Sequence, residues 1–251
     1  MRIITNERLI KRYSKLGQYL VIFGMAIIVV YFYLSSTGNE NLKEFQTRFS
    51  LLLLFGPIVA LITLFVGISL GNRYGGFPSY PILLNKALKG LDDKYSLYHF
   101  IAPTGHLLVG PAGLLLLFPK RQAGTITFKK NRWRQEKLTF IQSYLKFFGF
   151  ESIGRPDLEI GAEIEGVRKF ISKQIPETPF PDPQAVLIFT NEKAILAADD
   201  APIPTIRLDK LKDHVRKGMK GNTGKLTAEQ IAAVTAVLER GIPAQVESGE
   251  E

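Results

Sequence analysis

Residues 106–118 read HLLVGPAGLLLLF, an apolar run that is interrupted only by turn-forming residues. The sequence GPAG at 110–113 predicts a tight turn between two strands, 106–109 and 114–118. A strand as apolar as 114–118 is typical of the centre of a sheet that is covered on both faces. This run therefore predicts a buried central hairpin around which a domain is built.

Helices and strands alternate on both sides of this hairpin. The pattern predicts helices at 81–91, 157–175, 209–218 and 227–240, and strands at 95–102, 125–128, 132–134, 184–190 and 193–198. Thr227 and Gln230 have the spacing of a capping box at the start of the last helix. This order predicts a mixed α/β domain over residues 73–241, with a central sheet flanked by helices. The acidic end, 242–251, is expected to be a flexible tail.

The first third of the chain contains two long stretches without a charged residue, 17–36 and 49–71. Each is close to the ~20 residues that a helix needs to cross the hydrocarbon layer. A cleaved signal peptide would have a shorter apolar region that ends at small residues. Two core helices of a soluble domain seldom lack charges over such a length. We therefore predict a transmembrane hairpin over 17–72, with the lipid bilayer as its partner.

Basic residues in front of the first stretch predict the orientation of this hairpin. They are Arg2, Arg8, Lys11, Arg12 and Lys15, whereas the loop between the stretches has Lys43 and Arg48 balanced by Glu40 and Glu44. Lys and Arg stay on the cytoplasmic side. The expectation is a multi-pass protein of the cell membrane with both termini in the cytoplasm. Residues 1–16 form a basic segment, either a short helix on the membrane surface or a solvated tail.

Composition narrows the classes of partner. The net charge is +9 and the pI is near 9.6, which favours anionic partners such as nucleic acid or phospholipid head groups. The chain has no cysteine and three histidines, so thiolate metal sites are excluded and a histidine-rich site is not expected.

Residues 104–133 read TGHLLVGPAGLLLLFPKRQAGTITFKKNRW. This stretch resembles the nuclease-related domain (NERD), a branch of the restriction-endonuclease-like PD-(D/E)XK fold. The matching residues are His106, Gly110, Pro111, Gly113, Lys120, Gly124 and Trp133. The segments 185–189 and 204–208 resemble the closing strands of that domain. The resemblance covers roughly residues 80–218, and it implies a restriction-endonuclease-like fold.

The chain departs from this family at the two positions that matter for catalysis. Gly105 occupies the place of the family's metal-binding Asp, and Phe118 occupies the place of its Glu, two residues before Lys120. Neither residue offers a side-chain oxygen to Mg²⁺, which prefers such ligands. The resemblance therefore implies a degenerate site without a metal or other cofactor. Lys120 then has no role in hydrolysis.

Carboxylates elsewhere are an alternative source of metal ligands. Glu159, Glu163 and Glu165 lie on the predicted helix 157–175, and the first two share a helix face because they are four residues apart. With them the domain would be an active nuclease that uses Mg²⁺. We favour the interpretation that these residues form a solvated acidic face.

Basic residues cluster at the predicted hairpin after Lys120. Lys129, Lys130, Arg132 and Arg134 are expected to bind polyanions, with Trp133 packed beneath the hairpin. A second cluster follows at 210–225. The preferred function is a binding or scaffolding module at the cytoplasmic membrane face, without enzymatic activity. Besides the active nuclease, the other alternative is an accessory subunit that contacts a membrane protein partner.

Overall fold

A computed structural model describes residues 1–36, 47, 50–75, 78–136, 153–220 and 224–240. The chain divides into two compact units. One is formed by Arg8–Ser79, and the other combines Met1–Glu7 with most of the chain from Tyr80 onward. The predicted tail 242–251 and most of the predicted loop between the two apolar stretches lie outside the described residues.

The first unit consists of two helices that are long and apolar enough to cross a bilayer. Helix α1 spans Glu7–Ser36 and helix α3 spans Ser50–Leu70, followed by a π-helical turn, η1, at Gly71–Gly75. Both apolar stretches were predicted as helices. However, α1 begins ten residues before position 17, so residues 7–16 form neither a separate surface helix nor a tail.

Small residues bring α1 and α3 into close contact. Gly17 and Gly24 are the buried residues of α1. A Cβ atom added at Gly67 would lie 2.9 Å from the carbonyl oxygen of Gly17 and 2.9 Å from the Val21 backbone nitrogen. The outer surfaces of both helices expose large apolar side chains, including Phe23, Val30, Phe32, Ile58, Ile62 and Phe65. Such surfaces are suited to the hydrocarbon layer of a bilayer, whereas their exposure to water would be unfavourable.

The second unit is a mixed α/β domain around a six-stranded sheet with the order β1-β2-β3-β4-β7-β9. The strands are β1 Arg2–Thr5, β2 Ser96–His99, β3 His106–Gly110, β4 Gly113–Lys120, β7 Gln184–Phe189 and β9 Thr205–Arg207. Only β3 runs opposite to the others, because it pairs antiparallel with β2 and β4. A smaller sheet has the order β6-β5-β8, with β5 at Gly124–Lys129, β6 at Arg132–Glu136 and β8 at Ala194–Ala197.

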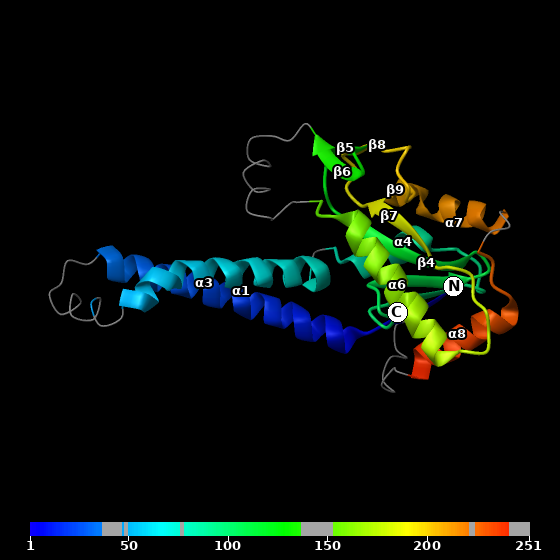
Figure 1. The fold of residues 1–251 in the computed structure, drawn as a ribbon, viewed down its shortest axis with the longest axis horizontal. Helices are drawn as coiled ribbons and strands as arrows, with labels where there is room; N and C mark the ends of the chain where they lie inside the picture. The colour runs from blue at the N-terminus through cyan, green and yellow to red at the C-terminus, as the bar shows by residue number, and fades with distance from the viewer. Residues whose placement is uncertain (37–46, 48–49, 76–77, 137–152, 221–223, 241–251) are drawn as a thin grey trace. The chain divides into compact units, whose positions relative to one another are not determined.

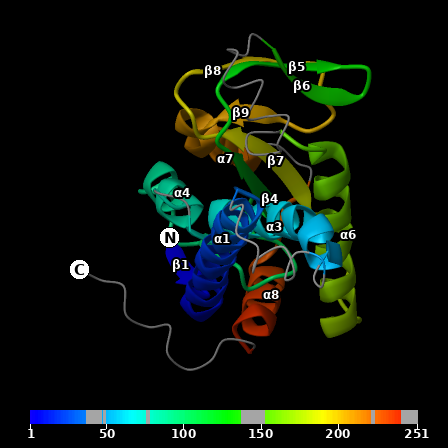
Figure 2. The same ribbon diagram turned by 90° about the vertical axis from the view of Figure 1, so that its left-hand side faces the viewer.

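Strand β4 is the buried central strand that the sequence predicted. Leu114, Leu116 and Phe118 face the core under α6 (Pro156–Gln174) and α8 (Ala228–Arg240). Leu115 and Leu117 face the opposite core under α4 (Tyr80–Leu88) and α7 (Leu211–Lys220). The sheet therefore lies between two helical layers, which Figures 1 and 2 show from two sides. A short 3-10 turn, η2, at Leu208–Lys210 leads into α7.

The Gly-Pro-x-Gly sequence forms the two-residue turn between β3 and β4, where Gly110 pairs with Gly113. Gly113 has a φ of 111°, and a side chain there would overlap the carbonyl oxygen of Gly224. A side chain at Gly110 would overlap the ring of Tyr95. Both positions thus require glycine, for conformational or for steric reasons.

Strand β1 was missed by the sequence analysis. Arg2–Thr5 pairs in parallel with Ser96–His99, and Ile4 is buried in the core. The strand predicted over 95–102 ends at His99, because Phe100 takes a positive φ of 57° that a strand does not allow. The capping box at α8 is confirmed: Gln230 N donates to Thr227 Oγ1 over 3.2 Å, and Thr227 N donates to Gln230 Oε1 over 2.9 Å.

The close contact between α1 and α3 predicts the effect of enlarging its glycines. Gly67→Leu should separate the helices and destabilise the pair by about 1–3 kcal/mol, because the new side chain has no space. Gly56→Leu, in the same helix, is the matched control, since nothing lies within 4 Å of a Cβ atom there. Thermal unfolding of the full chain in detergent measures the difference. Equal stability of the two variants would contradict this packing.

Candidate functional site

The carboxyl ends of five strands meet at one edge of the large sheet. Strands β1, β2, β4, β7 and β9 are parallel to one another, so residues such as His99, Lys120 and Phe189 end them at the same edge. Thr190 fixes the end of β4, since its backbone N–H and its hydroxyl both donate to the Lys120 carbonyl oxygen, at 2.9 and 3.2 Å. Open α/β sheets commonly bind ligands at this edge. We call it the carboxyl edge.

Gly105 and Phe118, the two positions of interest for metal binding, lie near this edge. The β3–β4 register pairs Leu107 with Leu116, and the same register leads back toward Gly105 and forward toward Phe118. Phe118 is only 8% exposed and belongs to the core beneath α6. An added Cβ at Gly105 would meet only the Phe100 ring, at 3.8 Å. A side chain thus fits at Gly105, whereas the Phe118 side chain is packed in the core.

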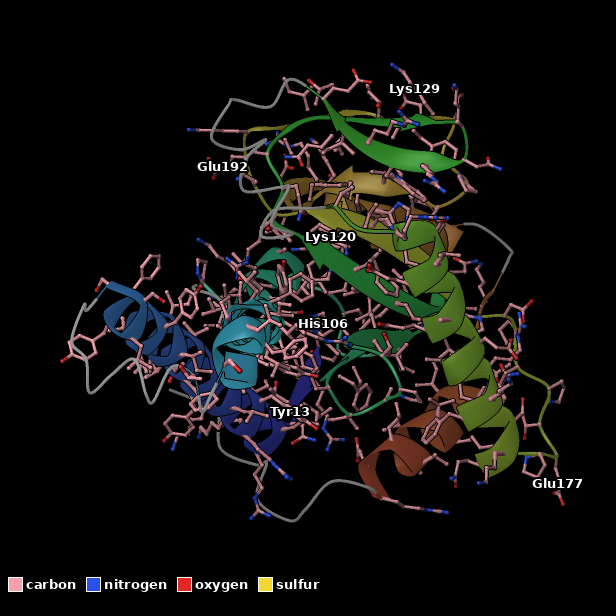
Figure 3. The ribbon with its side chains drawn as sticks, turned by 60° about the vertical axis from the view of Figure 1, so that its left-hand side comes forward. Tyr13, His106, Lys120, Lys129, Glu177 and Glu192 are labelled. Carbon is pink, nitrogen blue, oxygen red and sulfur yellow. The ribbon has the colours of Figure 1, made fainter. Side chains whose placement is uncertain are left out.

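Lys120 ends β4 beside helix α6 (Figure 3). Its Nζ atom lies 2.8 Å from Glu159 Oε2, and the Lys120 side chain is 19% exposed. Glu163, one turn further along α6, accepts a hydrogen bond from the Thr104 hydroxyl. Glu165 instead pairs with Arg168 and Lys169 on the surface. Glu159 and Glu165 are both about half exposed, as a solvated acidic face requires, and Glu159 and Glu163 in addition contact residues of the carboxyl edge.

These contacts do not assemble a metal-binding cluster. Within the described residues, no group of three or more His, Asp or Glu side chains is placed to hold a metal ion. The Glu159 carboxylate is already neutralised by the Lys120 ammonium group.

Two buried histidines lie at the carboxyl edge, where His99 ends β2 and His106 begins β3. His99 Nδ1 is 2.8 Å from His106 Nδ1, and His99 Nε2 is 2.9 Å from Asn85 Oδ1. Because an amide oxygen only accepts, His99 Nε2 carries the hydrogen and His99 Nδ1 accepts from His106. Burial lowers the pKa of His99 to about 3. His106, which matches the family resemblance, is thus part of a hydrogen-bonded network between helix α4 and the sheet.

The predicted polyanion-binding hairpin is formed by β5 and β6. Lys130 and Asn131 have φ values of 52° and 57°, as a two-residue type I′ turn requires. Lys129 (Figure 3) pairs with Glu136 over 2.9 Å. The other three basic residues, Lys130, Arg132 and Arg134, are exposed and form no ion pair within the described residues.

Trp133 supports the hairpin from below. It is 3% exposed, it contacts the Phe128 ring edge-to-face at 4.8 Å, and its Nε1–H donates to Thr205 Oγ1 over 3.0 Å. The prediction that Trp133 is a packing residue is confirmed. Arg132 lies close enough to Asp157 to contribute to the lowered pKa of that carboxyl group, although Arg155 is the main cause. The charges of the hairpin and of the first turn of α6 therefore interact.

The second basic cluster, at 210–225, has at least one lysine that is already engaged within the domain. Lys212 donates to the carbonyl oxygen of Lys89 over 2.6 Å, which ties α7 to the end of α4. Arg216 and Lys217 are exposed on the same helix. This cluster borders the core formed by Leu211 and Val215, and it begins three residues after Arg207, which ends β9 at the carboxyl edge.

The sequence analysis did not select Thr104, Asn85 or His99. Thr104 meets a glutamate 59 residues away, and His99 meets an asparagine 14 residues away. No local pattern marks such partners, since the folding of α4 and α6 onto the sheet brings them together.

Comparison with protein-family models, with curated proteins and with solved structures found no match to this chain. The resemblance to the nuclease-related domain therefore stays a prediction. What the structure does define is the class: two apolar helices followed by a mixed α/β domain with a helix-flanked central sheet.

The pKa of His99 predicts how stability depends on pH. Between pH 6.5, its ordinary pKa, and about 3, the unfolded chain binds a proton that the folded protein excludes. The free energy of unfolding should therefore fall by up to about 1.4 kcal/mol per pH unit as the pH drops below 6.5. The same stabilisation is fully present above pH 6.5.

His99→Gln should remove this share of the pH dependence. Urea titrations of the full chain in detergent, followed by the fluorescence of the only tryptophan, Trp133, measure the free energy at each pH. The comparison uses the slope against pH, so a lower overall stability of the variant does not affect it. Identical slopes for both proteins would show that His99 is not excluded from protonation.

Proposed function

We propose that the chain is a membrane-anchored, catalytically degenerate nuclease-like protein, whose α/β domain binds polyanions at the cytoplasmic face of the membrane. The observation that carries this proposal is the exposed group Lys130, Arg132 and Arg134 on a hairpin held in place by Trp133. Exposed cations on a supported hairpin provide the electrostatic surface that phosphate groups require.

Two features support the membrane anchor. The helices α1 and α3 have the required length and hydropathy, and their apolar outer surfaces are exposed in the protein itself. The excess of basic residues before the apolar stretch of α1 supports an orientation with both termini in the cytoplasm. The α/β domain would then meet cytoplasmic polyanions and the inner surface of the membrane.

The absence of catalysis is proposed from Gly105 and Phe118. In a restriction-endonuclease-like site the two carboxylates hold a divalent ion, which polarises the phosphate and lowers the pKa of the attacking water. Phe118 instead places an apolar ring in the core, where a cation without ligands would be very unfavourable. Lys120 alone is able to attract a phosphate but not to generate hydroxide.

Polyanion binding should weaken when the hairpin loses its charges. The variant with Lys129→Ser, Lys130→Ser, Arg132→Ser and Arg134→Ser should bind labelled DNA less tightly. The slope of log K against log salt concentration should be shallower by about 2.7, because each of three lost phosphate contacts contributes about 0.9 to it. Lys129→Ser alone is the control with a small effect, because Lys129 is paired with Glu136.

Fluorescence anisotropy of oligonucleotides with the full chain in detergent provides this measurement. The full chain is needed because strand β1 precedes the membrane helices, and a fragment starting at Tyr80 would lose it. Unchanged affinity and an unchanged salt slope in the fourfold variant would exclude this hairpin as the binding site.

A second candidate function is hydrolysis of nucleic acid with relocated carboxylates. The contact between Glu159 and Lys120, together with Glu163 at Thr104, favours it, since both glutamates reach the carboxyl edge. Under this alternative they would provide Mg²⁺ ligands that Gly105 and Phe118 lack. The lack of a third ligand among the described residues is why we rank it second.

We expect no hydrolysis of single- or double-stranded DNA or of RNA by the full chain in Mg²⁺ or Mn²⁺, because the site lacks both metal ligands. Cleavage that is lost in Glu159→Gln or Glu163→Gln, but kept in Glu165→Gln, would establish the second candidate. Glu165→Gln is the matched control because this glutamate pairs with surface cations on the same helix. Cleavage that survives all three changes would indicate a contaminating nuclease.

A further inference from the structure

Four basic residues form a stripe along the first turns of α1, and we call it the α1 stripe. Arg8, Lys11, Arg12 and Lys15 follow the spacing i, i+3, i+4 and i+7 of one helix face. All four side chains are exposed. The stripe therefore forms a continuous basic surface on one side of the helix.

The opposite side of the same turns packs within the helical unit. Tyr13 (Figure 3) stacks on Tyr74, with 5.1 Å between the ring centroids, and Gly17 contacts Gly67. Arg73 lies with its guanidinium carbon 5.8 Å from the centre of the Tyr74 ring. The α1 stripe is thus fixed on the outer side of the pair, where other molecules have access to it.

The stripe is unfavourable for the helix itself. Cations near a helix N-terminus oppose the macrodipole, and like charges four residues apart, as in the pairs Arg8–Arg12 and Lys11–Lys15, repel each other. Arg12 and Lys15 form no ion pair within the described residues. An anionic partner on this side would stabilise Arg12 and Lys15.

Orientation in the membrane does not explain why the charges share one face. The positive-inside rule depends on how many cations flank a span, not on the side of the helix that carries them. A one-sided arrangement is instead what binding to discrete anionic groups alongside the helix requires.

The depth of the stripe indicates which anionic groups these are. Helix α1 is continuous over its 30 residues. At ~1.5 Å per residue, the twenty residues from position 17 onward span ~30 Å of hydrocarbon, and the ten preceding helical residues extend ~15 Å beyond it, through a head-group layer that is ~5–8 Å thick. Arg12 and Lys15 therefore lie at the level of the lipid phosphates, and Arg8 and Lys11 lie on the outer side of that layer, within reach of it through their long side chains.

We propose that the α1 stripe binds the phosphate groups of anionic phospholipids in the cytoplasmic leaflet. The proposal rests on the proposed membrane anchorage but not on polyanion binding by the β5–β6 hairpin. Each cation near a membrane surface adds to the attraction of anionic lipids. Lipids bound along one side of α1 would neutralise the stripe and leave the face that packs on α3 undisturbed.

The test compares lipids in contact with the full chain reconstituted in phosphatidylcholine vesicles. Spin-labelled phosphatidylglycerol and spin-labelled phosphatidylcholine report the motionally restricted fraction of each lipid. The parent protein should select phosphatidylglycerol by at least about fivefold. A variant with Arg8→Gln, Lys11→Gln, Arg12→Gln and Lys15→Gln should lose the selectivity, and the charge-conserving Arg8→Lys with Arg12→Lys should keep it.

The matched control removes four exposed charges that lie outside both the stripe and the hairpin, by Lys94→Gln, Lys173→Gln, Lys193→Gln and Lys217→Gln. It should keep the selectivity. Loss in this control and retention in the stripe variant would overturn the stripe proposal and leave polyanion binding by the hairpin intact. If no lipid is restricted by the parent protein and alkaline carbonate extracts it from vesicles, the membrane anchorage fails, and the stripe proposal fails with it.

Should the fourfold stripe variant fail to reconstitute, two milder variants keep the proposal testable. Arg8→Gln with Lys11→Gln, and Arg12→Gln with Lys15→Gln, each remove half of the stripe. Each should lower the selectivity for phosphatidylglycerol toward that of a neutral helix, and a selectivity equal to that of the parent protein in both variants would contradict the proposal.

Discussion

Strand β4 has apolar side chains on both of its faces, and the α/β unit is arranged so that neither face meets water. Leu114, Leu116 and Phe118 require one helical layer, and Leu115 and Leu117 require another. Fully burying each such side chain contributes roughly 1.5–3 kcal/mol. The two layers, α6 with α8 and α4 with α7, follow from this requirement, and they fix what surrounds the end of β4.

The same burial determines the chemistry of the carboxyl edge. Phe118 and Lys120 are two residues apart on one strand, so both side chains point toward α6. Phe118 belongs to the core, whereas Lys120 reaches past it to Glu159. This ion pair is half exposed on the Glu159 side and contributes about 0–1 kcal/mol at most. Its role is therefore to hold Lys120 in place rather than to stabilise the fold, and it leaves the edge with little net charge.

Elements with a local signal were predictable from the sequence, and those that depend on distant partners were not. The hairpin 106–118, the helix 157–175 and the cap at Thr227 each carry their signal within a few turns of chain. Strand β1 has a single buried side chain, Ile4, and forms only because Ser96–His99 lies beside it. Likewise, the composition of α6 does not reveal which of its glutamates meets Lys120, because the angle at which a helix packs on a sheet is set by the core.

Strand β1 also changes how the two units are connected. The chain leaves the α/β unit at Asn6, whose backbone N–H donates to the His99 carbonyl oxygen over 3.0 Å, and re-enters it at Tyr80, whose ring contacts His106 at 6.3 Å. Both connections therefore belong to the carboxyl edge. Two attachments restrict the motion of a tethered domain more than one does, and tethering raises the effective concentration of the surface to which it is attached. With the helices in a bilayer, the α/β domain would stay close to the membrane, so that even a weak affinity for groups at its surface would be enough for binding there.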